Sequence, residues 1–159
     1  MGKHVEIPVG HGRVALVDEQ DKHLVEGIEW FSFQAHRAWY AATKTNPRVY
    51  MHRLIMDAPQ GMEVDHIDGD GLNNTRDNLR VCTHQQNLAN QRHQLRDTHS
   101  RYKGVTFCLR EKLWKAQIKA NQQHINLGTF KNEDDAARAY NRAALQAWGE
   151  FARLNDVGE

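Results

Sequence analysis

The sequence predicts an α+β protein built from three consecutive parts, and three observations lead to this prediction. Short apolar runs separated by glycine and proline turns fill the first 47 residues, which is typical of a β-rich unit. A glycine-rich polar segment at 64–75 is then followed by a strand-length run and a capped helix. From residue 101, three strand-length runs precede one amphipathic helix, which predicts a three-stranded antiparallel sheet packed on that helix.

The β-rich N-terminal part spans residues 1–47. Two apolar runs, 5–9 and 14–17, flank a Gly-His-Gly turn and predict a β-hairpin. Two aromatic-rich runs follow at 30–33 and 38–42, and the Asn46-Pro47 dipeptide then signals a turn. We expect the core of this part to come from its aromatic side chains, namely Trp30, Phe31, Phe33, Trp39 and Tyr40.

The central part spans residues 48–92. Residues 49–56 suit either a strand or a short helix, and residues 57–75 are a loop broken by one apolar step at Val64. A brief strand is expected at 79–82. Thr83 and Gln86 have the spacing of a capping box, so a helix should begin there and run to about Arg92.

The C-terminal part spans residues 101–157, after a polar linker at 93–100. Strands are expected at 104–109, 113–120 and 124–130. Asn132 should cap the following helix, since asparagine is a favoured N-cap residue. Three acidic residues fill the first turn of this helix, where the helix dipole favours them, and Gly149 provides a stop signal at its end. So small a unit needs large core side chains, for which the candidates are Trp114, Phe130, Tyr140 and Trp148.

Composition and charge exclude several classes of protein. The apolar runs are far shorter than the ~20 residues of a membrane helix, and the N-terminus lacks a secretory signal. The only cysteines, Cys82 and Cys108, exclude a disulfide framework or a four-cysteine zinc site and suit a reducing cytoplasm. The net charge of +1 hides a net charge of −2 over residues 51–97 and of +6 over residues 98–131. The basic segment therefore suits a polyanionic partner, whereas residues 1–97 are expected to bind DNA poorly by themselves.

The chemistry is expected around Asp65 and His66. Hydrolysis of a phosphodiester requires a divalent cation and a base that activates water, and a histidine is a suitable base near neutral pH. Magnesium is held by one or two protein oxygen groups, so Asp65 and an amide such as Asn87 on the following helix would suffice. A plain surface turn is the alternative, since aspartate and glycine favour turns. The spacing does not fit a calcium loop.

The central part resembles an HNH endonuclease of the ββα-metal branch found in phage and intron homing endonucleases. The resemblance covers residues 48–92 and is carried by residues 50–54, 64–69, 73–74, 78–80 and Asn87. It implies that His66 is the general base, that Asp65 and Asn87 hold Mg²⁺ (or Mn²⁺), and that no zinc is bound. It also implies that Asn78 braces the loop by hydrogen bonds. Asn90 is an alternative to Asn87, and His84 and His93 are nearby rivals.

His52 and Arg53 precede this segment. His52 is either a residue near the site or a structural histidine, and Arg53 is a candidate for contact with DNA phosphates. The remaining histidines are interpreted as surface or hydrogen-bonding residues.

The C-terminal sheet is expected to present a basic face. Lys115, Gln117 and Lys119 alternate with the apolar residues of their strand, so they should share one face while the helix covers the other. Arg101, Lys103 and Arg110 are expected beside them. An open basic sheet can enter a DNA major groove, although a solvated charged face is the alternative.

Residues 101–155 resemble the DNA-binding domain of plant ethylene-response (APETALA) factors. The matching residues are 102–105, 127–130, 136–140 and 154–155. The resemblance implies a sheet that reads DNA through Lys103, Arg110, Trp114, Lys115, Gln117 and Lys119. Lys103 stands where the plant proteins have arginine, and Thr106-Phe107-Cys108 replaces an arginine cluster, so the plant target sequence is not carried over.

The sequence as a whole predicts a metal-dependent endonuclease of homing or mobile-element type. It would act on double-stranded DNA in the cytoplasm of a bacterial or phage-infected host cell, with no membrane partner. The alternative is a non-catalytic DNA-binding regulator with a degenerate nuclease unit. The target sequence, nicking versus double-strand cutting and the oligomeric state stay open.

Overall fold

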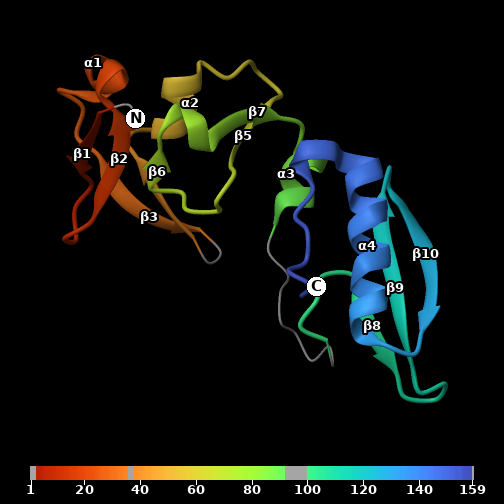
Figure 1. The fold of residues 1–159 in the computed structure, drawn as a ribbon. Coiled ribbons are helices and arrows are strands. Elements are labelled where there is room, and N and C mark those ends of the chain that lie inside the picture. The colour runs from red at the N-terminus through yellow and green to blue at the C-terminus, as the bar shows by residue number, and fades with distance from the viewer. Residues whose placement is uncertain (1–2, 36–37, 92–99, 159) are drawn as a thin grey trace. The chain divides into compact units, whose positions relative to one another are not determined.

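A computed structural model (Figure 1) describes residues 3–35, 38–91 and 100–158. The chain divides into two compact units, Met1–Asn87 and Leu88–Glu159. Both units combine strands and helices, so the predicted α+β class is confirmed. In the described parts of the chain, no helix is long and apolar enough to cross a membrane.

The first unit opens with the predicted hairpin. Strands β1 (His4–Pro8) and β2 (Val14–Asp18) pair antiparallel, and the short strand β6 (Asn73–Asn74) joins β2 in parallel. The turn between β1 and β2 needs left-handed backbone, with φ of 75° at Gly10 and 68° at Gly12. Glycine adopts such angles without steric cost, which accounts for the Gly-His-Gly sequence.

Two further strand pairs and two short helices follow, and a third helix spans the boundary between the units. In chain order these are helix α1 (Lys22–Val25), a ribbon of β3 (Phe31–Ala35) and β4 (Ala38–Ala42), helix α2 (Met51–Met56), a ribbon of β5 (Glu63–His66) and β7 (Leu79–Cys82), and the boundary helix α3 (His84–Asn90). Single turns of 3-10 helix occur at Glu19–Asp21 and Arg76–Asn78. Residues 49–56, which suited either a strand or a helix, thus form α2.

The core of the first unit is mainly aliphatic, which differs from the expectation of an aromatic core. Trp30 is buried as expected, but the other four aromatic side chains of the β3–β4 region are only partly buried. Ala41 and residues from β2, α1 and α2 fill the interior instead. The reason is strand alternation, because it turns Phe31 and Phe33 away from the side on which Ala41 is buried.

An ion pair ties the turn before β7 to the 3-10 turn that follows the N-terminal hairpin. The carboxylate of Asp21, a buried residue, accepts from the partly exposed Arg76 through Nε at 2.7 Å and Nη2 at 2.8 Å. The Arg76 backbone N–H also donates to Asp18 at 2.8 Å. These charge-assisted bonds hold the residues that follow β6 in one position.

The capping box at the start of α3 is confirmed. The Thr83 N–H donates to Gln86 Oε1 at 2.8 Å, and the Gln86 N–H donates to Thr83 Oγ1 at 3.3 Å. The helix ends at Asn90, slightly before its expected end near Arg92, and Gln91 is a bend. Residues 92–99, which include most of the predicted linker, lie outside the described residues.

The second unit is a three-stranded antiparallel sheet packed on one long helix, as predicted. The strands β8 (Val105–Cys108), β9 (Leu113–Ala120) and β10 (Gln123–Phe130) lie in the order β10-β9-β8. Helix α4 (Glu133–Trp148) covers one face of the sheet (Figure 1), and Asn132 caps it by accepting from the Asp134 N–H at 2.8 Å. Tyr140 is buried in this core, with Trp114, Phe130 and Trp148 packed at its edge.

Gly104 is a position at which the second unit has no room for a side chain. Its φ is 76°, and a Cβ would lie 2.6 Å from the Gln117 carbonyl oxygen and collide with the Tyr140 ring. Gly104→Ala should therefore lower the free energy of unfolding by about 3 kcal/mol, from strained backbone and overpacking together. Gly27→Ala is the matched control, since Gly27 has the same φ of 76° with open space around it. Urea denaturation of both variants checks this, and equal losses would contradict the steric explanation.

His52 is a buried histidine, and among the residues that the structure describes none forms a hydrogen bond with its Nδ1. Burial, with smaller contributions from His66 and Arg53, lowers its pKa to about 3. The unfolded chain therefore binds this proton from about pH 6.5 downward while the folded chain does not, so stability must fall as the pH falls.

From about pH 7 to about pH 5, this one group should cost about 2 kcal/mol of unfolding free energy. Urea titrations of the wild type and of His52→Phe at both pH values isolate the effect, because the carboxylates titrate in both proteins. An equal acid loss in the two proteins would contradict a depressed pKa at His52.

Candidate functional site

The predicted base and carboxylate lie side by side at the end of β5. In the β5–β7 ribbon Asp65 pairs with Arg80, and His66 pairs with Leu79. Adjacent strand residues point to opposite faces, so the Asp65 and His66 side chains have different neighbours. Both are buried, at 6% and 5% exposure.

Asn74 sets the orientation and tautomer of the His66 ring. The His66 Nε2 lies 3.2 Å from Asn74 Oδ1, and the Asn74 amide nitrogen donates to the Leu72 carbonyl at 3.2 Å. This second bond fixes the Asn74 amide with its oxygen toward the ring, so Nε2 carries the proton and Nδ1 carries the lone pair. Nδ1 is consequently the basic nitrogen of His66.

The surroundings of His66 keep it neutral. Burial lowers its pKa below the ordinary value, against the opposing effects of the Asn74 hydrogen bond and the carboxylates of Asp68, Asp65 and Asp70. Its ring meets the His52 ring edge-on at 4.9 Å, and the Tyr40 ring lies 5.8 Å away. A neutral imidazole held in one tautomer can accept a proton from water.

The Asp65 carboxylate is fixed from across the ribbon. Arg80 donates to its Oδ2 from Nε at 2.9 Å and from Nη2 at 2.7 Å. The interaction is nearly dry, because the side chains are 12% and 7% exposed. Such a charge-assisted fork restricts the carboxylate to one orientation.

Asn78 is hydrogen-bonded within the loop that follows His66. Its Nδ2 donates to Asp68 Oδ1 at 3.0 Å and to the Asn73 carbonyl at 2.8 Å, and its Oδ1 accepts from the Asp68 N–H at 3.0 Å. Burial alone would raise the pKa of Asp68, but bonds from the Asp70 N–H, Asn73 and Asn78 outweigh it and lower this pKa. These bonds link the loop to the residues just before β7.

Asn87 is directed toward β5 by Glu63, a residue for which the sequence analysis predicted no role. The Asn87 Nδ2 donates to Glu63 Oε2 at 2.6 Å, and the ring Nδ1 of His84 lies 2.8 Å from Glu63 Oε1. Glu63 shares the strand face of Asp65, two residues away. This period of two was the signal that could have identified Glu63 in the sequence.

The donor set on this face suits a hard divalent cation. Asp65, Glu63 and Asn87 offer oxygen atoms, which Mg²⁺ and Mn²⁺ prefer. Burial, and to a lesser extent the carboxylates of Asp65 and Glu63, raise the pKa of Cys82 to about 11. Within the described residues, no three His, Cys, Asp or Glu side chains form a metal-binding group.

The other candidates of the first unit and of α3 are placed as follows. The Arg53 guanidinium donates to the carbonyls of Met62 at 2.7 Å and Ala58 at 3.4 Å, and so holds the 58–62 turn. Asn90 lies one helical turn after Asn87 and is buried, and His93 lies outside the described residues.

In the second unit, the structure brings Lys115, Gln117 and Lys119 together on the sheet face opposite α4. Ala116, Ile118 and Ala120 alternate with them and are buried. The register adds polar neighbours to the open face, since Thr106 and Thr129 flank Lys115, Asn126 pairs with Gln117, and His124 pairs with Lys119. Glu111 lies 3.4 Å from Lys115 and 3.6 Å from Arg110.

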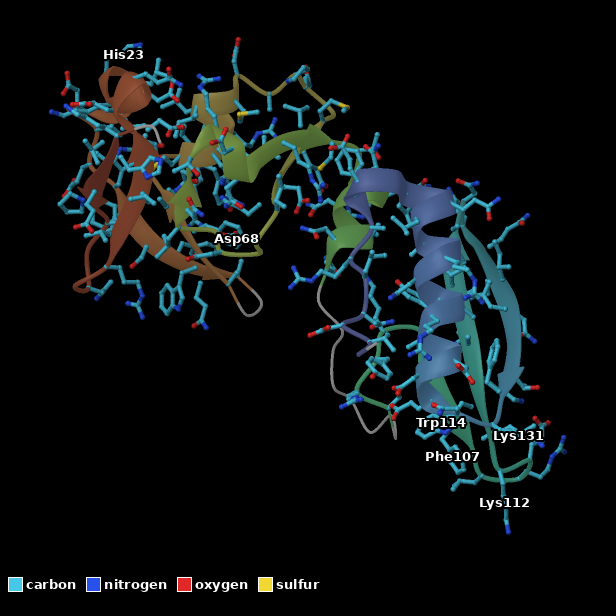
Figure 2. The ribbon with its side chains drawn as sticks, viewed as in Figure 1. His23, Asp68, Phe107, Lys112, Trp114 and Lys131 are labelled. Atoms are coloured by element: carbon cyan, nitrogen blue, oxygen red, sulfur yellow. The ribbon has the colours of Figure 1, made fainter. Side chains whose placement is uncertain are left out.

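Three further candidates have different surroundings. Lys103 donates to the carbonyls of Ala89 at 2.6 Å and Gln91 at 2.7 Å, and burial lowers its pKa to about 8. The Trp114 ring lies 4.8 Å from the Phe107 ring at a tilt of 57°, and Trp114 packs against the core (Figure 2). Arg101 is exposed and donates to the Tyr102 hydroxyl at 2.6 Å. None of these three side chains extends the row formed by Lys115, Gln117 and Lys119.

Comparison with known proteins gives the family. A family model described as HNH endonuclease matches residues 49–89. The chain is 32% identical over 151 residues to an uncharacterised HNH endonuclease of Acanthamoeba polyphaga mimivirus, covering 93% of this chain and 78% of that protein. It is 30% identical over 121 residues to Protein 3.8 of Escherichia phage T7, covering 76% of this chain and 98% of the phage protein.

The C-terminal part has a second set of relatives. It is 40% identical over 62 residues to the AP2-like ethylene-responsive transcription factor TOE2 of Arabidopsis thaliana, covering 39% of this chain and 13% of the plant protein. No solved structure gives a significant match. The extent of the match to the mimivirus protein shows that this chain belongs to the HNH endonuclease family, with an AP2-like region at its C-terminal end.

Proposed function

We propose that the chain is a metal-dependent DNA endonuclease of homing or mobile-element type that hydrolyses phosphodiester bonds with His66 as general base. The observation that carries the proposal is the His66–Asn74 pair, which presents a neutral imidazole with Nδ1 as the basic atom, one residue along β5 from Asp65. The phage relative supports an enzyme that works in the cytoplasm of a bacterial or phage-infected host cell.

In the proposed reaction, His66 Nδ1 takes a proton from water as the water oxygen attacks phosphorus. The P–O bond to the leaving oxygen breaks, and that oxygen gains a proton from solvent. Asn74 stabilises the imidazolium form, because its oxygen accepts from Nε2–H throughout. Asn78 keeps the loop after His66 in place through its three hydrogen bonds.

Asp65 and Asn87 would hold Mg²⁺ or Mn²⁺, with Arg80 and Glu63 fixing their side-chain orientations. When bound, such a cation neutralises charge on the phosphate and on the leaving oxygen. Zinc is not expected, since this donor set is made of oxygen atoms.

The C-terminal unit is proposed to target the enzyme to double-stranded DNA. Lys115, Gln117 and Lys119 on the open face would contact the duplex, with Arg110 at the adjoining turn. The similarity to plant AP2-like factors supports this assignment. A DNA contact by Arg53, Arg101, Lys103 or Trp114 stays a prediction.

Supercoiled plasmid should be cut by the wild type with magnesium and left intact with EDTA. His66→Ala should lower the cleavage rate by ~10²–10⁴-fold, because the general base acts in the transition state, while its affinity for DNA stays nearly unchanged. His23→Ala is the matched control, since His23 is an exposed histidine on α1, at the end of the unit opposite Asp68 (Figure 2). Binding without any cleavage by the wild type would favour the non-catalytic regulator, and robust cutting by His66→Ala would refute the assigned base.

Lys115→Gln with Lys119→Gln should weaken DNA binding and flatten its salt dependence. Each lost phosphate contact reduces the slope of log K against log salt by about 0.9, so a reduction of about 1.8 is expected when both lysines contact phosphates. Arg142→Gln is the control, because Arg142 is exposed on α4, on the other side of the sheet. Gel shifts over a salt series measure the slope, and an unchanged slope in the double variant would mean that the open face is only solvated.

A further inference from the structure

Partly buried aromatic side chains of the β3–β4 ribbon lie beneath cations. The Lys44 Nζ is 3.5 Å from the Phe31 ring centroid, and the Arg48 guanidinium carbon is 4.0 Å from the Phe33 centroid. Both cationic side chains belong to exposed residues. A cation over an aromatic face is attracted by the ring quadrupole, so each head group is held in a defined place.

The strand register puts these two pairs on the outer face of the ribbon. Phe31 pairs with Ala42, and Phe33 pairs with Tyr40, so Phe31, Phe33 and Tyr40 share one face. The opposite face carries Ser32 and Ala41, and Ala41 is fully buried in the core. We call the face of Phe31, Phe33 and Tyr40, together with Lys44 and Arg48, the outer ribbon face.

The loop at 43–49 is built to return Lys44 and Arg48 over this face. The Thr43 N–H donates to the Val49 carbonyl at 2.9 Å, and the Val49 N–H donates to Thr43 Oγ1 at 3.0 Å. Inside the loop, Thr45 Oγ1 donates to the Pro47 carbonyl at 3.0 Å. The two cations are therefore presented by a hydrogen-bonded loop.

The outer ribbon face leads to the proposed base. The Tyr40 ring lies 5.8 Å from both the His66 and the His52 rings. The loop after β5 comes close enough that a Cβ on Gly71 would collide with the Tyr40 ring. Tyr40 thus connects the outer ribbon face to His66, the residue that would activate water.

Charge along the sequence points to an anionic occupant. Residues 30–56 contain four Lys or Arg and no Asp or Glu, a net charge of +4, although residues 1–97 as a whole carry −2. A two-stranded ribbon fits the major groove of B-DNA, and arginine and lysine are the main donors to its phosphates. The positive charge of this segment therefore suits the phosphates of a DNA duplex, and the shape of the ribbon suits the major groove beside them.

We propose that the outer ribbon face is a second DNA-docking surface, which grips the phosphate backbone next to the scissile bond through Lys44 and Arg48. This inference rests on the proposed DNA substrate and goes beyond it, because it places part of the substrate grip in the nuclease unit. It also differs from the expectation, based on net charge, that residues 1–97 bind DNA poorly.

The test measures DNA binding by the full-length chain in the His66→Ala background, so that the DNA stays intact. Lys44→Gln with Arg48→Gln should reduce the slope of log K against log salt by about 1.8 and weaken binding by about 50-fold near 0.1 M salt. Lys3→Gln with Lys22→Gln removes the same charge from exposed positions elsewhere in the unit and should leave the slope nearly unchanged.

A charge-preserving exchange, Lys44→Arg with Arg48→Lys, should keep the slope, and thermal melting should give a folded protein for every variant. The proposal would be overturned by an unchanged slope in the glutamine variant, or by an equal reduction of the slope in the Lys3/Lys22 control. In either case the contacts of Lys44 and Arg48 with the aromatic rings would serve only surface packing. Plasmid cleavage by the wild type is scored separately. If the Lys44/Arg48 glutamine variant binds DNA more weakly but the wild type cuts no plasmid, the proposed nuclease activity is refuted and the docking role of the outer ribbon face is not. If the wild type cuts plasmid but the glutamine variant binds DNA as before, only the docking role is refuted.

Discussion

The hydrogen bond between Asn74 and His66 depends on pairing far away in the sequence. Asn74 belongs to β6, whose two residues are held in place by parallel pairing with β2 of the N-terminal hairpin. The ion pair between Asp21 and Arg76 fixes the chain just after that strand. The β-rich N-terminal part therefore does more than pack on the central segment, because it positions the side chain that determines which nitrogen of His66 is basic.

The sequence predicted the local features of this arrangement and missed most of the long-range ones. The capping box of α3, the Asn132 cap and the alternation of β9 are set by neighbouring residues, and each was correctly predicted. Asn74 lay within the recognised motif, but its role depends on where the loop meets the His66 ring. Arg80 reaches Asp65 only through the β5–β7 register, which no local pattern reveals. Sequence spacing thus predicted which residues surround the site, but it did not predict which contacts they make.

The aromatic residues of β3 and β4 show why composition alone misjudged the first unit. Large aromatic side chains are usually buried, so Phe31, Phe33, Trp39 and Tyr40 were assigned to the core. The ribbon is two-stranded, however, and Phe31, Phe33 and Tyr40 lie on the face opposite the core residue Ala41. Trp39 shares the face of Ala41 and is still only partly buried. Cations cover Phe31, Phe33 and Trp39, the last under Arg13 at 3.7 Å. An exposed cation held over a partly exposed ring can contact an anionic ligand, whereas a ring buried in the core cannot.

Dividing the proposed DNA contacts between two units would have a physical consequence for affinity. On the C-terminal sheet, Glu111 lies beside both Arg110 and Lys115 and offsets part of their charge, so this face alone would bind DNA with moderate affinity. The outer ribbon face contributes two cations, which is also modest. When two such surfaces belong to one chain, binding of the first makes binding of the second an intramolecular step, and the combined affinity exceeds either affinity alone. In a nuclease built in this way, binding of DNA by either surface would favour binding by the other, which links targeting to cutting without requiring either surface to bind tightly.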